Sequence, residues 1–132
     1  MSARYAFECL AHLARLPAGR SATVGELAAR AKLPPSFLAK VLRRLVKKGL
    51  VGAKRGPRGG FILAREPGTI CALDVLDAAG VAGPRRLCIR GMRKCSQARP
   101  CAAHGAILRA ERAFRAAMSE ITVADLARKS AF

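Results

Sequence analysis

Three cysteines and a histidine in the C-terminal half of the chain have the side chains needed to bind a soft metal centre. Cys88, Cys95, Cys101 and His104 fall within seventeen residues, in a stretch rich in Arg, Gly and Pro that shows no helical or strand periodicity. Thiolates and imidazoles are ligands for zinc, iron and iron–sulfur clusters. Little else would hold this stretch in shape, so the sequence predicts a metal-binding loop over about residues 84–104.

Two other uses of these side chains remain open. A set of three Cys and one His is also common in structural zinc sites, although those usually contain two Cys that are two to four residues apart. Here the gaps between successive cysteines hold six and five residues. The third use is a metal-free thiol redox switch, which neighbouring arginines would favour by lowering thiol pKa values.

The remaining cysteines and the lack of an export signal indicate a reducing compartment. Five cysteines is an odd number, which fits a disulfide framework poorly. No secretory segment and no apolar run of membrane-spanning length are visible, so we expect a cytoplasmic protein without a membrane partner. Cys9 and Cys71 stand within apolar helical patterns and are expected to be small buried hydrophobes.

The charge of the chain indicates a polyanionic partner. Twenty-five Lys and Arg against eight acidic residues give a formal charge of +17 in 132 residues. Residues 1–66 carry 14 basic and 3 acidic groups, whereas residues 67–132 carry 11 and 5. Nucleic acid is the usual partner of such an excess, and the N-terminal half is the better candidate for contacting it. A merely soluble basic surface, or one that meets an anionic membrane, remains an alternative.

The N-terminal half has the pattern of a helix-turn-helix followed by a basic hairpin. Helices are predicted over residues 3–16, from a Thr23–Glu26 capping box to about residue 31, and from Pro35 to Lys48, closed by Gly49. Two short strands, residues 50–54 and 61–63, then enclose a tip with three glycines and two arginines. The expected fold is mainly α with a small β-hairpin wing, that is, a winged helix-turn-helix.

The C-terminal half is predicted to contain a short helix over residues 70–80, a long helix over about 102–119 and a last short helix. The long helix has an apolar seam with no evident partner, which favours a homodimer, although packing against its own core is the alternative. The seam consists of Ile107, Ala110, Phe114, Ala117, Met118 and Ile121. We expect residues 1–66 to form the DNA-binding region and residues 67–132 to pack with it as one domain.

Candidate DNA contacts lie on the third helix and at the hairpin tip. Basic side chains suit phosphates or the minor groove, and side chains near the start of a recognition helix reach base edges. The predicted set is Ser36, Phe37, Ala39, Lys40, Arg43, Arg44, Lys47, Lys48, Arg55, Arg58 and Gly59. The base-reading members are predicted to be Ser36, Phe37, Ala39, Lys40 and Arg43.

The order of these parts resembles a known family, the iron–sulfur-cluster-sensing winged-helix transcriptional repressors of the IscR/NsrR type. The likeness rests on Arg4-Tyr5-Ala6, the 38–50 helix, the wing from Arg55 to Leu63 and the Cys88…Cys95…Cys101-x-x-His104 loop. It implies a homodimer on a two-fold DNA operator, with the long helix as the dimer interface. It also implies an iron–sulfur cluster, with a 2Fe-2S form favoured over 4Fe-4S.

Three departures from that family pattern bear on the site. The Cys88–Cys95 gap is one residue longer than in the cluster regulator that the chain resembles. Ala39 stands where that regulator has a Glu, which changes the expected base preference. Family members with a carboxylate ligand carry it near the N-terminus, where this chain has Arg4, so His104 is expected to be the fourth ligand.

The sequence as a whole predicts a dimeric DNA-binding transcriptional regulator that senses redox state, nitric oxide or iron–sulfur status. No nucleophile–base pairing, phosphate loop or paired-carboxylate motif is visible in it. An enzyme is therefore not expected, nor is a small-molecule substrate.

Overall fold

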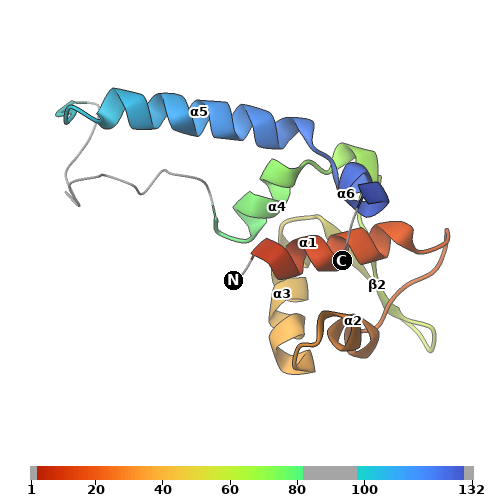
Figure 1. The fold of residues 1–132 in the computed structure, drawn as a ribbon. Coiled ribbons are helices and arrows are strands. Elements are labelled where there is room, and N and C mark those ends of the chain that lie inside the picture. Colours follow the sequence, from red (N-terminus) through yellow and green to blue (C-terminus); the bar gives the residue numbers. More distant parts are fainter. Residues whose placement is uncertain (1–2, 82–97, 130–132) are drawn as a thin grey trace.

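The computed structural model describes residues 3–81 and 98–129, which form a mainly helical fold with one two-stranded hairpin (Figure 1). The elements are α1 Ala3–Arg15, α2 Val24–Ala31, α3 Pro35–Lys47, β1 Val51–Lys54, β2 Gly60–Leu63, the 3₁₀ turn η1 Pro67–Thr69, α4 Ala72–Ala78, α5 His104–Glu120 and α6 Val123–Lys129. The predicted fold class is confirmed, and each predicted helix and strand is present to within a few residues. No described helix is long and apolar enough to cross a membrane.

Helix α1 lies at the centre and contacts elements on two sides. Figure 1 shows it between α2 and α3 below and α4 and α6 above, and it also contacts β2. Its fully buried positions include three small residues, Ala6, Cys9 and Ala11, as well as Leu10 and Leu13. Small side chains let neighbouring helices approach closely, which is why α1 is covered on more than one face.

Local sequence signals fix the ends of the helix-turn-helix. Thr23 Oγ1 accepts the Glu26 backbone N–H at 3.2 Å, and the Glu26 carboxylate accepts the Thr23 N–H at 2.7 Å. Hydrogen bonding of the Glu26 carboxylate to the backbone N–H and then to the side chain of Thr23 lowers the pKa of Glu26, so the capping box persists into mildly acidic solution. Pro35 opens α3, where its missing N–H leaves no bond unmade, and Gly49, at φ +73°, ends it.

The hairpin is tied to the loop that follows α1. Strands β1 and β2 pair antiparallel, with Val51 opposite Leu63 and Lys54 opposite Gly60. Ala22 adds an isolated bridge to Phe61, in which the two residues exchange backbone hydrogen bonds of 3.0 and 2.7 Å. A lone two-stranded hairpin is marginally stable in water, so this third segment supports the wing.

The C-terminal helices share a core with the N-terminal half. Ile70, Val75 and Val123 belong to the same buried cluster as the leucines of α1 and α3. The Val123 N–H donates to the Ile70 carbonyl at 2.8 Å, and the Ala72 N–H donates to the Ile121 carbonyl at 2.7 Å. Buried groups from both halves therefore stabilise one another.

The two isolated cysteines were predicted to be buried, and this prediction is right for one of them. Cys9 is 2 % exposed, and burial raises the pKa of its thiol to about 12, so it remains a protonated, unreactive hydrophobe. Cys71 is only partly buried and precedes α4, with its backbone N–H donating to Asp74 Oδ2 at 3.1 Å. The helix begins two residues later than predicted, because residues 67–69 form the 3₁₀ turn and Cys71 pairs with Thr122 in an isolated bridge.

A core substitution in α3 should measure how much the DNA-binding half depends on this packing. Leu42 is fully buried, so Leu42→Ala should lower the free energy of unfolding by about 2–5 kcal/mol through lost burial and a residual cavity. Val46, on the same helix, is 38 % exposed, so Val46→Ala should change the free energy of unfolding by less than about 0.5 kcal/mol. Urea denaturation at one protein concentration checks both, and equal losses would contradict the described burial.

Candidate nucleic-acid interface and metal loop

One face of α3 gathers polar and basic side chains. Ser36, Lys40, Arg43 and Lys47 recur at intervals of four, three and four residues, which places them in one row along the helix. All four are exposed, whereas Leu38, Val41, Leu42 and Leu45 on the opposite side are buried. The buried side fixes the rotation of α3, so the basic row faces solvent and can enter a groove of DNA.

The other predicted positions on α3 flank this row. Phe37 is 36 % exposed, and its ring packs edge-on against Tyr5, with centroids 5.7 Å apart. Part of the Phe37 ring therefore packs between α3 and α1, and the rest is exposed. Ala39 is partly buried and Lys48 is exposed. Arg44 is exposed but extends toward the end of α4, where its Nη1 lies 3.8 Å from the position of a Cβ added to Gly80.

The hairpin tip presents two further arginines to solvent. Arg55 and Arg58 are exposed on either side of a tight turn, in which the Gly59 N–H donates to the Gly56 carbonyl at 2.8 Å. Gly59 itself is partly buried, and a Cβ there would lie 2.4 Å from the Lys54 carbonyl oxygen. Gly59 therefore allows the tight turn of the hairpin tip, and it has no side chain with which to contact DNA.

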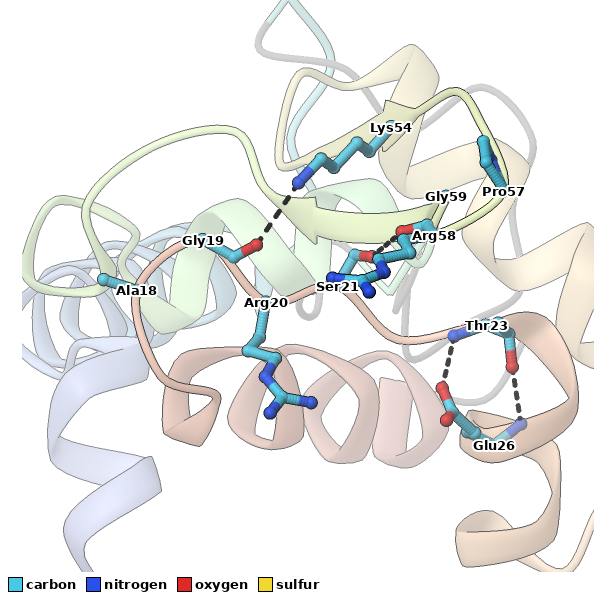
Figure 2. A pocket seen from close by; sticks show the side chains of 10 residues that line it. All are labelled: Ala18, Gly19, Arg20, Ser21, Thr23, Glu26, Lys54, Pro57, Arg58 and Gly59. Carbon is cyan, nitrogen blue, oxygen red and sulfur yellow. Dashed lines mark hydrogen bonds between the residues drawn. The ribbon is translucent and has the colours of Figure 1, made fainter.

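Between the wing and the loop after α1 lies an open hollow of about 660 Å³ (Figure 2). The Ser21 hydroxyl donates to the Arg58 carbonyl at 3.0 Å, and the Lys54 ammonium donates to the Gly19 carbonyl at 3.3 Å. Neither Ser21 nor Lys54 is among the contacts predicted from the sequence. No local signal could have found them, because each partner is more than thirty residues away along the chain.

The structure describes two of the four candidate metal ligands. Cys101 and His104 lie at the start of α5, and the His104 N–H donates to the Cys101 carbonyl at 3.0 Å. Both residues are partly buried, and the Cys101 thiol forms no disulfide. Cys88 and Cys95 lie outside the described residues, and within residues 3–81 and 98–129 no three metal-binding side chains cluster. A partly exposed cysteine just before α5 and a histidine at its first position, three residues apart, fit the donor chemistry of a thiolate-bound metal or cluster.

Near the N-terminus, Arg4 already has partners within its own chain. Its Nε donates to Glu8 Oε1 at 2.9 Å, and its guanidinium lies 5.9 Å from the centroid of the Tyr5 ring. The Glu8 carboxylate raises the pKa of Arg4, so this side chain stays cationic and cannot supply a metal ligand.

Helix α5 extends beyond the rest of the described fold and has no fully buried residue (Figure 1). Arg115 pairs with Asp77 of α4 at 3.4 Å, which anchors one part of the helix. The predicted seam is divided: Ile107, Met118 and Ile121 are partly covered, whereas Ala110, Phe114 and Ala117 are exposed, Phe114 by 37 %. Packing within the described chain therefore leaves half of the seam uncovered.

Comparisons with known proteins identify one family profile and several related transcriptional regulators. The sequence profile of Rrf2, described as an iron-dependent transcriptional regulator, matches residues 1–129. The chain is 43 % identical over 103 residues to a predicted HTH-type transcriptional regulator of Aquifex aeolicus (strain VF5), covering 76 % of this chain and 71 % of that protein. It is 36 % identical over 129 residues to another from Mycobacterium tuberculosis (strain H37Rv), covering 95 % and 78 %.

Two solved structures have a similar fold. The structure of CymR, the global cysteine regulator of B. subtilis, has a TM-score of 0.78 at 23 % identity and covers 98 % of this chain and 97 % of its own. The structure of T. potens IscR has a TM-score of 0.73 at 23 % identity, with coverages of 97 % and 84 %. At these identities the likeness establishes the winged-helix fold.

Substitutions on α3 and at the wing should distinguish base reading from phosphate contact. Lys40→Ala or Arg43→Ala should reduce the preference for operator over random DNA by about 1–3 kcal/mol if a base contact is lost. Arg58→Ala should weaken binding to all sequences and flatten the salt dependence by roughly one unit per lost phosphate contact. Fluorescence anisotropy across a salt series measures both. Equal losses for operator and random DNA in the α3 variants would remove the base-reading role from Lys40 and Arg43.

Proposed function

Because the chain belongs to the Rrf2 family of transcriptional regulators, we propose that it acts as a homodimeric, operator-binding repressor controlled by an iron–sulfur cluster. The cluster ligands in this proposal are Cys88, Cys95, Cys101 and His104. The signal is a change in redox state, nitric oxide or iron–sulfur supply. Each part of the proposal depends on a different feature of the chain.

The DNA-binding part is supported by two basic elements on one side of the molecule. In Figure 1, α3 and the hairpin tip flank α2, and both lie on the side away from α5. The exposed row on α3 suits the major groove, and the arginines at the hairpin tip suit adjacent phosphates or a minor groove. This pairing of a basic helix face with a basic hairpin tip is the observation that carries the proposed function.

The dimer part is supported by the uncovered half of the α5 seam. Phe114 is among the most exposed large apolar side chains of the described residues, with Ala110 one turn before it and Ala117 one turn after it. An aromatic ring flanked by alanines can pack closely against a second copy of the same helix, and a two-fold pairing matches a two-fold operator.

The cluster part is supported by the donor set and its setting. Iron–sulfur clusters are held by cysteine thiolates, and a histidine ligand raises the reduction potential of such a centre. In this chain the Cys101 thiol and the His104 imidazole are both accessible at the start of α5. When bound, the cluster would supply a one-electron redox centre and a target for oxidants at the base of the proposed dimer helix.

A thiol switch or a structural zinc site is the second candidate. The partial exposure and unpaired state of Cys101 suit either one, in contrast to the buried Cys9. Metal content separates the three possibilities, because a cluster contains iron and sulfide, a zinc site contains zinc, and a thiol switch contains neither.

Removal of a loop cysteine should abolish iron binding. In anaerobically purified protein, Cys88→Ala, Cys95→Ala and Cys101→Ala should each lose the visible absorbance, iron and acid-labile sulfide of the wild type. His104→Ala should leave a centre that is labile or spectrally altered. Cys71→Ala is the matched control, since Cys71 is partly buried outside the loop, and it should keep the full iron content. A Cys95→Ala variant with full iron would exclude this ligand set.

A charge in the α5 seam should separate the proposed dimer. Phe114→Glu places a carboxylate in an apolar contact, where burial without a partner is strongly unfavourable, so the protein should be monomeric at micromolar concentration. Ala116→Glu is the control, because Ala116 is exposed on the opposite face of α5. Light scattering gives the masses, and an unchanged mass for Phe114→Glu would place the interface elsewhere.

A further inference from the structure

The wing is held to the loop after α1 by hydrogen bonds from its tip and from both of its strands. The Ser21 hydroxyl donates to the Arg58 carbonyl at 3.0 Å, next to the Ala22–Phe61 backbone pair. On the other strand, the Lys54 ammonium donates to the Gly19 carbonyl at 3.3 Å (Figure 2). Both strands of the hairpin are therefore fastened to one short segment.

Two glycines make this close approach possible. A Cβ on Gly60 would lie 2.6 Å from the Ala22 carbonyl oxygen and 3.2 Å from Ser21 Oγ. A Cβ on Gly59 would meet the Lys54 carbonyl oxygen at 2.4 Å. Real Cβ atoms do not come this close to backbone oxygen. A larger residue at position 60 would therefore push β2 away from Ser21 and Ala22, and one at position 59 would distort the hairpin turn itself.

The hollow itself does not have the character of an anion site. Arg20, Lys54 and Arg58 line it, but so does the carboxylate of Glu26. The pKa of Glu26 is lowered by its hydrogen bonds to Thr23, so this group is negatively charged at neutral pH. The Lys54 ammonium already has the Gly19 carbonyl as a partner. The hydrogen bonds that line the hollow are better explained as contacts that hold the wing against the loop after α1.

We propose that Ser21 is a positioning residue for DNA binding, whose hydroxyl fixes the backbone of Arg58 so that its guanidinium is presented to DNA in one orientation. Among the described hydrogen bonds, the Ser21 hydroxyl is the partner of the Arg58 carbonyl. The Gly59 N–H of the same planar peptide unit donates to the Gly56 carbonyl within the turn, so the Ser21 bond is the one that ties this unit to the loop after α1. Ordering the tip before DNA arrives reduces the entropy lost on binding. This inference rests on the proposed DNA-binding function.

A double-mutant cycle tests the role of Ser21. The probe is a duplex of about 30 base pairs, selected by the anaerobic wild-type protein from a random library and long enough for two half-sites one turn apart. Ser21→Ala should weaken binding about two- to tenfold, the range of one net hydrogen bond. In the Arg58→Ala background it should have less than about a twofold effect, because the guanidinium that it positions is gone.

The salt dependence gives a second readout that a purely structural role would not change. Ser21→Ala removes no charge, yet its salt slope should shift toward that of Arg58→Ala if the Arg58–phosphate contact is lost. Ser21→Thr keeps the hydroxyl and should bind like the wild type. The control Ser119→Ala removes a like bond, from Ser119 Oγ to the Ala116 carbonyl at 2.7 Å on α5, and should leave the slope unchanged.

The outcomes separate this inference from the proposed function. If the wild type selects no duplex, the DNA-binding proposal fails. If Arg58→Ala weakens binding but Ser21→Ala does not, or if Ser21→Ala weakens binding equally in both backgrounds, DNA binding stands and the positioning role of Ser21 is overturned. If Arg58→Ala has no effect, the wing makes no contact for Ser21 to position, and the inference is likewise overturned.

Discussion

The packing of α1 on two sides is the constraint on which the rest of the described structure depends. Ala6, Cys9 and Ala11 are small enough to let α1 contact elements on both sides. Leu10 and Leu13 are buried as well and belong to the same core. Loss of this packing would separate the helix-turn-helix from α4 and α6. Since buried apolar area is the main favourable term in folding, this shared core also fixes the orientation of α3.

The end of α1 connects this core to the wing. Arg15 Nε donates to the Ala127 carbonyl of α6 at 3.0 Å, and the segment that follows contains Gly19, Ser21 and Ala22, which bind the hairpin. One continuous stretch of chain thus contacts the C-terminal layer at one end and the wing at the other. Packed and hydrogen-bonded contacts of this kind are one means by which a change near α5 and α6 would alter DNA binding.

The proposed sensing and dimer functions meet on α5. Cys101 and His104 lie at its start, and Ala110, Phe114 and Ala117 lie along it. The helix is fastened to α4 through Arg115 and Asp77, whose ion pair is exposed and therefore weak. Helix α5 therefore has few stabilising contacts within the described part of its own chain. In the proposed dimer, a change of ligands at Cys101 and His104 would act on the same helix that contacts the second subunit.

Elements with local sequence signals could be predicted before the fold was known. The Thr23–Glu26 box, Pro35 and Gly49 set the bounds of α2 and α3 through bonds within a few residues, and these predictions are confirmed. Ser36, Lys40, Arg43 and Lys47 were all among the predicted DNA contacts. The burial of the opposite side of α3 turns this row to solvent.

The tertiary structure decided what depends on partners far along the chain. The sequence predicts a helix over residues 3–16, but its packing against α6 on one side and against α2 and α3 on the other appears only in the folded chain. Cys71 follows a helical pattern in the sequence, yet its bridge to Thr122 places it before α4 and partly open. The Ser21–Arg58 bond spans 37 positions, and no periodicity encodes such a contact. The spacing of residues predicts which of them share a face of a helix. Which other elements that face contacts is determined only when the whole chain packs.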